Sequence, residues 1–217
     1  MSEPALSLTD KSQPAPAKRR NRQAEVIDAA IDIFYRKGYS AAAIQDVAEA
    51  VGVLKGSLYY YIASKEDLLF RICESVHDES TKILDEVLAL DLQPLERVRT
   101  YIERHVRWYL ENTQQVGVFF REWRFLTGER FELVAQHRRG YDRTIRELIH
   151  AAQETGEVDP GISEKYASFY ILAAVNAVPE WYRPGGRDSA QSIAEAYANL
   201  TIGMLTGTHE NSPEPAR

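Results

Sequence analysis

One short segment of the sequence concentrates groups that bind phosphate oxygens. It covers residues 52–68 and has the sequence GVLKGSLYYYIASKEDL. Lys55 supplies a cation, Ser57 supplies a hydroxyl, and Gly56 between them lets another backbone approach closely. Three tyrosines follow at residues 59–61, and neighbours on a helix point about 100° apart, so at least one phenol must face outward. We expect a surface that contacts a polyanion; burial of all three tyrosines in the core is the alternative.

The charge of the chain is unevenly distributed. The net charge is −6, but residues 1–65 hold nine Lys or Arg against seven Asp or Glu, which gives +2, and the remainder holds −8. A basic cluster precedes the first expected helix, at Lys18, Arg19, Arg20 and Arg22. A local positive surface suits a polyanionic partner in spite of the acidic total. A solvated basic tail is the alternative.

The sequence lacks the patterns that catalysis or metal binding requires. Its five histidines, at residues 77, 105, 137, 150 and 209, do not have the spacing of metal ligands. The single cysteine, Cys73, has no evident base beside it, and no glycine-rich nucleotide-binding loop occurs. We therefore expect a protein that is not an enzyme and that uses neither a cofactor nor a metal.

The composition indicates a soluble protein of the cytoplasm. One cysteine cannot form an internal disulfide, which favours a reducing compartment. The N-terminus has no apolar signal segment, and the longest apolar stretch, residues 169–178, is too short to span a bilayer. We expect no membrane association.

Helical periodicity covers almost the whole chain, and signals for strands are absent. The expected fold is all-α with about nine helices, at residues 20–37, 43–51, 54–60, 64–90, 95–111, 115–125, 130–154, 164–178 and 189–206. Residues 1–17 and 209–217 are expected to be disordered tails. Between them we expect a small domain at residues 18–65 and a larger helical domain at residues 66–208.

The first domain has the plan of a helix-turn-helix. A nine-residue helix, a tight turn at Gly52 and a short helix follow the first long helix. The short helix is too small to be stable alone, so Leu58 and Ile62 must anchor it to the core. Its other face carries the phosphate-binding side chains of the opening segment.

These residues resemble the DNA-binding domain of TetR/AcrR-type transcriptional regulators. The resemblance lies in IQDVAEAVGVLKGSLYYYIASKEDLL and extends over about residues 20–70. It implies an all-α homodimer with an N-terminal domain that binds palindromic operator DNA and a C-terminal domain that binds a small molecule and dimerises. The chain departs from the family pattern at Ala43 and Leu54, whose side chains cannot cap a helix as the family's usual residues do.

The resemblance and the chemistry of the side chains together give the expected DNA contacts. Matched positions of the family assign contacts to Gln45, Lys55, Gly56, Tyr59, Tyr60, Tyr61 and Lys65. The basic cluster adds Arg19 and Arg20, and the hydroxyl of Ser57 adds a phosphate contact.

The C-terminal half resembles a narrower group of TetR-type regulators. The patterns that carry this resemblance are REWRFL at residues 121–126, RRGYDRTI at 138–145 and NAVPEWYRPGG at 176–186. That group controls fatty-acid, phenylacetate or sterol-ring degradation and responds to acyl-CoA thioesters. Such a ligand needs an apolar cavity with basic groups at its mouth, which aromatic residues beside arginines can supply. The expected ligand contacts are Phe120, Arg121, Trp123, Arg124, Tyr141, Asn176 and Trp181.

Other interpretations of the C-terminal half stay open at this point. Aromatic residues at helical spacing also fill cores, and arginines are usually solvated. A TetR-type repressor of an efflux gene that responds to a lipophilic drug-like ligand is the main alternative, and a constitutive DNA-binding protein is another. The arginines beside the aromatic residues favour an anionic ligand over a cationic drug.

The last helices are expected to form the dimer interface. Small and medium apolar residues recur on one face of residues 189–206 at a spacing that suits close helix contacts. The expected interface residues are Tyr170, Ile193, Tyr197, Leu200, Thr201 and Met204. A helix that packs within its own chain is the alternative.

Overall fold

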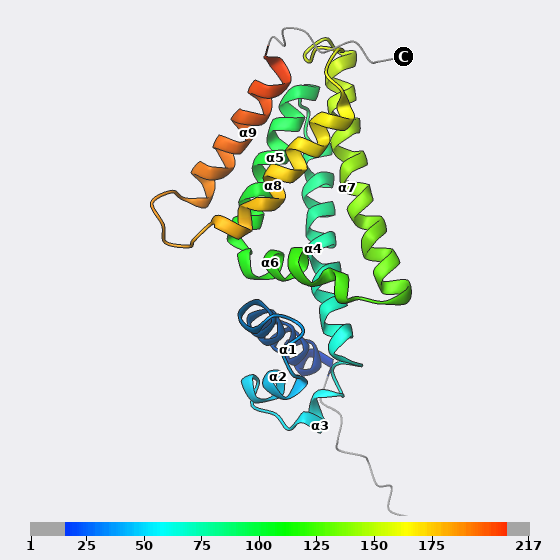
Figure 1. Ribbon diagram of the computed structural model, residues 1–217, viewed down its shortest axis with the longest axis vertical. Coiled ribbons are helices and arrows are strands. Elements are labelled where there is room, and N and C mark those ends of the chain that lie inside the picture. Colours follow the sequence, from blue (N-terminus) through cyan, green and yellow to red (C-terminus); the bar gives the residue numbers. More distant parts are fainter. Residues whose placement is uncertain (1–15, 208–217) are drawn as a thin grey trace, which may run out of the picture.

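Helices account for all the regular structure of the computed structural model, which describes residues 16–207, with side chains from residue 21 onward. The elements are α1 Pro16–Lys37, α2 Ile44–Ala50, α3 Lys55–Leu58, α4 Lys65–Leu88, α5 Pro94–Glu111, α6 Thr113–Glu122, the 3₁₀ turn η1 Trp123–Phe125, α7 Gly128–Glu154, α8 Glu164–Trp181 and α9 Ala190–Thr206 (Figure 1). The described residues contain no strand, so the predicted all-α class is confirmed. Residues 1–15 and 208–217, which hold nearly all of the predicted tails, lie outside the described residues.

Local chemistry explains most of the helix boundaries. Ser64 caps α4 by accepting a hydrogen bond from the Asp67 backbone N–H at 3.0 Å, as the sequence predicts. Gly38 ends α1 with a φ of 77°, a left-handed conformation that favours glycine. Ala43 offers no side-chain cap to α2, but the Asp46 carboxylate accepts a hydrogen bond from the Ala43 backbone N–H at 2.9 Å. Only one of the two hydrogen bonds of a capping box is therefore present, the one from the backbone of the capping residue to the side chain three residues later.

Several boundaries differ from the prediction, and three of the differences involve a proline or a glycine. Helix α1 begins at Pro16 rather than near residue 20, because proline is well tolerated in a first helical turn. Helix α7 begins at Gly128, which the sequence indicated as a break. Helix α8 continues through Pro179 to Trp181, because a proline this close to the end of a helix removes only one backbone hydrogen bond.

Helix α4 runs from the small N-terminal unit of α1–α3 into the larger bundle of α5–α9 (Figure 1). At its N-terminal end the Glu66 carboxylate accepts a hydrogen bond from the Thr127 backbone N–H at 2.8 Å. Asp67 is buried and pairs with Arg130 at 3.2 Å and with Arg71 at 2.8 Å. These contacts fix the start of α4 to the start of α7.

Helix α6 makes the second connection between the two units. It lies across the end of the bundle next to α1 (Figure 1). A Cβ atom at Gly117 would lie 3.0 Å from the Tyr35 ring, so any other residue there would require this ring to move by a few tenths of an ångström. The hydrophobic core that begins in α1–α3 continues into α4 and α6, with Phe34, Leu58 and Phe119 among its buried members. Packing is thus continuous across residue 65, where the domain boundary was predicted.

None of the described helices combines the length and the apolar character that a bilayer crossing requires.

Candidate functional site

The surface predicted to contact DNA is built around the four-residue helix α3. Leu58 and Ile62 are buried and hold this short helix against the core, as predicted. Tyr59 and Tyr60 are 50% and 73% exposed, so the alternative in which all three tyrosines are buried is wrong. Tyr61 is partly buried and packs against the core of the N-terminal unit.

Other residues of the predicted DNA surface differ in their exposure and in whether their side chains already have a partner in the chain. Lys55 and Gly56 are exposed, and a Cβ atom added to Gly56 would meet open space. Gln45 is exposed and donates a hydrogen bond to Glu49 at 2.8 Å. Lys65 is partly buried; its Nζ lies 4.2 Å from the centre of the Tyr39 ring, and burial lowers its pKa. Lys65 therefore also binds the loop after α1.

Ser57 is partly exposed within α3. Arg19 and Arg20 belong to the first turns of α1, but their side chains lie outside the described residues.

A cavity of about 90 Å³ lies among α5, α7 and α8. Aliphatic side chains and Phe120 form part of its wall. The remaining wall is aromatic and polar, and consists of Tyr101, His105, Tyr109, Arg138, Tyr141 and Asn176. No Asp or Glu lines it.

Arg138 is the cation of this cavity, and it faces the cavity without a counter-charge. Among the described residues it makes no ion pair and no side-chain hydrogen bond. Its guanidinium carbon lies 4.9 Å from the Trp123 ring and 5.6 Å from each of the Phe119 and Phe120 rings. Burial lowers the pKa of Arg138. Contacts with aromatic faces offset only part of the desolvation of a partly buried cation, so an anionic or carbonyl oxygen would be stabilised here.

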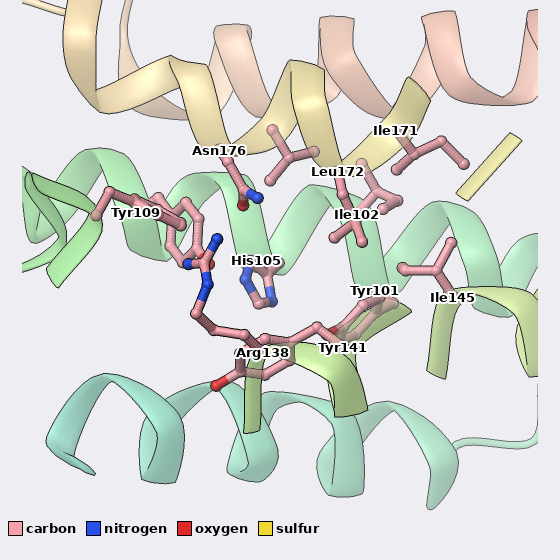
Figure 2. A pocket seen from close by; sticks show the side chains of 12 residues that line it. Tyr101, Ile102, His105, Tyr109, Arg138, Tyr141, Ile145, Ile171, Leu172 and Asn176 are labelled. Carbon is pink, nitrogen blue, oxygen red and sulfur yellow. The ribbon is translucent and has the colours of Figure 1, made fainter. Parts of the chain in front are cut away.

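Two further polar groups face the same space without a protein partner. His105 is buried, and burial lowers its pKa to about 4, so the ring is neutral near pH 7. Its Nδ1 has no hydrogen-bond partner within the described part of the chain. The Asn176 amide, which likewise has no hydrogen-bond partner among the described residues, points from α8 toward Arg138 and His105 (Figure 2). Buried polar groups normally have partners, so the unpartnered His105, with the partly buried Arg138 and Asn176 beside it, favours a ligand that supplies oxygen atoms.

The structure brings three of the seven predicted ligand residues to this cavity. They are Phe120, Tyr141 and Asn176. The other four lie elsewhere.

Arg121 faces α1, with its guanidinium 4.7 Å from the Tyr35 ring, because Gly117 one turn earlier brings the two helices together. Trp123 stacks on Phe131 at 5.3 Å, and Arg124 is exposed over the outer side of Trp123. Trp181 stacks on Tyr197 of α9 at 6.3 Å.

Sequence reasoning missed most of the residues that line the cavity, and Arg138 and His105 are the most important of them. Arg138 was available in the RRGYDRTI pattern, three residues before Tyr141. His105 could have been found from the spacing of Tyr101, His105 and Tyr109, which recur every four residues and therefore share one face of α5.

The predicted dimer residues divide into two groups. Tyr170 and Leu200 are 66% and 71% exposed, which is unusual for large apolar side chains. Ile193 and Thr201 are buried within the chain, where α9 packs against α5, and the alternative of an intrachain helix face applies to them. Tyr197 and Met204 are partly buried against the same core.

Comparisons with protein families assign both halves of the chain. Residues 26–72 match the family of bacterial regulatory proteins described as the tetR family. Residues 91–205, more than half of the chain, match the Tetracyclin repressor-like, C-terminal domain. The chain belongs to the TetR family. This TetR-family chain is therefore a transcriptional regulator and not an enzyme, as the sequence predicted.

Individual relatives are similar in sequence to this TetR-family chain over most of its length. The HTH-type transcriptional repressor KstR2 of Mycobacterium tuberculosis is 24% identical over 187 residues, which cover 86% of this chain and 94% of KstR2. The fatty acid metabolism regulator protein of Bacillus subtilis is 21% identical over 88% of this chain and 98% of its own.

Solved structures show the same fold. The structure of KstR2 of Mycobacterium tuberculosis superposes with a TM-score of 0.81 and 23% identity over 86% of this chain and 96% of its own. The structure of AibR in complex with isovaleryl coenzyme A and operator DNA superposes with a TM-score of 0.74 and 25% identity over 85% and 98%.

The unpaired guanidinium gives a prediction about stability. Replacement Arg138→Met removes a partly buried charge that has no carboxylate, so we expect the free energy of unfolding to stay the same or to rise by about 1 kcal/mol. The matched variant Arg130→Met leaves the buried carboxylate of Asp67 with one partner fewer, and we expect it to lose about 2 kcal/mol. Urea unfolding followed by circular dichroism measures both. A clear loss of stability in Arg138→Met would show that Arg138 has a counter-charge after all.

Proposed function

We propose that this TetR-type repressor binds operator DNA as a homodimer and releases it when a small molecule with an apolar body and a polar oxygen group, most simply an acyl-CoA thioester, enters the α5–α7–α8 cavity. One observation carries the choice of ligand: Arg138 faces an apolar cavity that contains no carboxylate. A lipophilic cation would meet a positive charge there, which argues against the alternative of a cationic drug.

The size of the cavity limits what fits in the structure as it stands. A volume of about 90 Å³ is well below the several hundred Å³ of typical ligand pockets. It accepts the end of a short acyl chain, whereas the remainder of a thioester must lie outside or widen the cavity. Arg138, His105 and Asn176 would then hold the carbonyl or another oxygen of the ligand.

The relatives support a ligand of this class. The names of two of them refer to ketosteroid regulation and to fatty acid metabolism, and AibR was solved with isovaleryl coenzyme A. These are properties of those proteins. Together with the chemistry of the cavity, these relatives favour an acyl-CoA thioester over other anionic ligands.

Widening of the cavity gives a route to operator release. Its walls include α7, and the start of α7 holds the start of α4 through the contacts of Asp67 and Glu66. A ligand that binds more tightly to the widened state shifts the population toward that state. Movement of α4 would change the separation of the two α3 helices, which must match about 34–36 Å between successive major grooves.

The DNA contact can be tested at Gly56. Replacement Gly56→Ala places its methyl group in open space, so we expect stability to stay the same or to rise by up to about 1 kcal/mol. The same methyl group would separate α3 from the DNA backbone, and we expect operator affinity to fall at least tenfold. Fluorescence anisotropy with a labelled operator fragment measures this loss.

Two variants control this experiment. Gly140→Ala adds a methyl group in open space on α7 and is expected to bind DNA as the wild type does. Lys55→Ala should lower the slope of log K against log salt by about one. Wild-type affinity in Gly56→Ala would exclude the proposed approach of α3 to DNA.

The ligand contact can be tested at Arg138. We expect Arg138→Met to bind isovaleryl-CoA and a long-chain acyl-CoA at least tenfold more weakly than the wild type, because a charge-assisted hydrogen bond is lost. Isothermal titration calorimetry on the free dimer measures both. Arg139→Met, on the exposed side of the same helix, is the control and should bind like the wild type. Equal losses in both variants would indicate a general effect of charge.

The dimer surface can be tested at the exposed end of the proposed interface. A carboxylate placed in a buried apolar interface has no partner, so Leu200→Asp and Tyr170→Glu should shift the protein to a monomer at micromolar concentration. Size-exclusion chromatography with light scattering gives the mass. Leu133→Asp, an exposed leucine of α7, is the control. A dimer that persists in both interface variants would place the contact elsewhere.

A further inference from the structure

A pair of histidines joins α4 to α7 beside the cavity. The rings of His77 on α4 and His137 on α7 lie flat on each other, with 3.5 Å between their centres and 11° between their planes. The Tyr141 hydroxyl lies 2.9 Å from Nδ1 of His77. Since Tyr141 also lines the cavity, this group of three side chains connects the cavity wall to α4.

The position of this group suits the transmission of a signal. His137, Arg138 and Tyr141 occupy about one turn of α7, so a shift of α7 that changes the cavity also changes the histidine pair. His77 lies on α4 twelve residues after Lys65, where the helix leaves the DNA-binding unit. The pair is thus a contact between the helix that bears the cavity and the helix that positions α3.

We propose that the His77–His137 stack is a proton-sensitive latch: two neutral rings hold α4 against α7 in the arrangement that binds DNA, and a proton taken up from solvent by either ring releases it. This inference rests on the operator binding proposed above, and it adds a second signal to the ligand.

The groups around the stack determine the direction of the effect. Glu74 and Asp78 face it from α4, Arg143 and Tyr141 from α7, and Tyr101 from α5. Nδ1 of His137 lies 3.4 Å from a Glu74 oxygen, and burial raises the pKa of Glu74.

Burial lowers the pKa of both histidines. For His77 the neighbouring His137 lowers it further, although Glu74 and Asp78 act in the opposite direction.

The sign of the effect follows from these shifts. Separated imidazoles take up protons near pH 6.5, and the stacked rings do so only at lower pH. Acid therefore favours separation of the rings, and the contribution of the stack is present above about pH 6.5 and is lost below it. General electrostatics predicts the reverse for DNA binding, because protonated histidines add positive charge and strengthen contacts with phosphates.

The test compares operator affinity at pH 7.5 and pH 5.5 at constant ionic strength. We expect the dissociation constant of the wild type to rise about tenfold at pH 5.5, within the range typical of coupling between sites. His137→Phe keeps a flat ring against His77 and removes the second imidazole. A proton on His77 then faces an aromatic ring, which is a favourable cation–π contact, so the affinity of this variant should change by less than twofold. His150→Gln, an exposed histidine of α7 that contacts Glu164, should behave like the wild type.

Two results of the operator-binding assay would contradict the proposed latch: a wild-type affinity that is constant or higher at pH 5.5, or the same tenfold loss in His137→Phe.

Hydrogen exchange of the backbone of residues 65–88, corrected for intrinsic rates, tests the latch without DNA. Exchange should accelerate at pH 5.5 in the wild type and not in His137→Phe, and equal behaviour of the two would exclude the latch. Absence of operator binding at pH 7.5 would contradict the proposed function and leave the exchange experiment to decide about the latch.

Discussion

A partly buried guanidinium without a carboxylate, that of Arg138, is the constraint on which the functional interpretation depends. A folded protein normally pairs a charge that it withdraws from water, whereas Arg138 has no ion pair within the described residues and contacts three aromatic rings instead. His105 and Asn176 add polar atoms without partners to the same cavity. Such an arrangement lowers stability unless another molecule completes it. The cavity is therefore better suited to recognition than to packing.

The same turn of α7 relates the cavity to the DNA-binding unit. Arg138 and Tyr141 face the cavity, while His137 stacks on α4. Nearer the DNA-binding unit, α7 holds the start of α4 through Arg130 and Thr127. A change in the position of α7 must therefore act on α4 at two points. Helix α6 offers a parallel connection, because Phe120 lines the cavity while Gly117 contacts α1.

The sequence predicted the helices well, because apolar periodicity and glycines mark them locally. Ser64 and Gly38 are examples of boundaries that need no tertiary information. The residues of the sites were harder to predict from the sequence, because the direction in which a side chain points depends on which helices pack together. Arg121 faces α1 only because Gly117 permits close approach, and no pattern in the sequence shows that contact. The sequence of an apolar helix face likewise does not show what the face packs against. Ile193 was predicted to contact a second copy of the chain, but it is buried within its own chain.

The most direct test of the account is release of the operator by ligands that differ in charge but share an apolar body. The dimer would be bound to DNA from beside its own gene and titrated with an acyl-CoA, free coenzyme A, the corresponding free acid and a lipophilic quaternary ammonium ion. The account predicts release by the thioester, little or no release by free coenzyme A, and none by the cation. Release by the cation but not by the thioester would contradict the role of Arg138 and support a drug-responsive repressor.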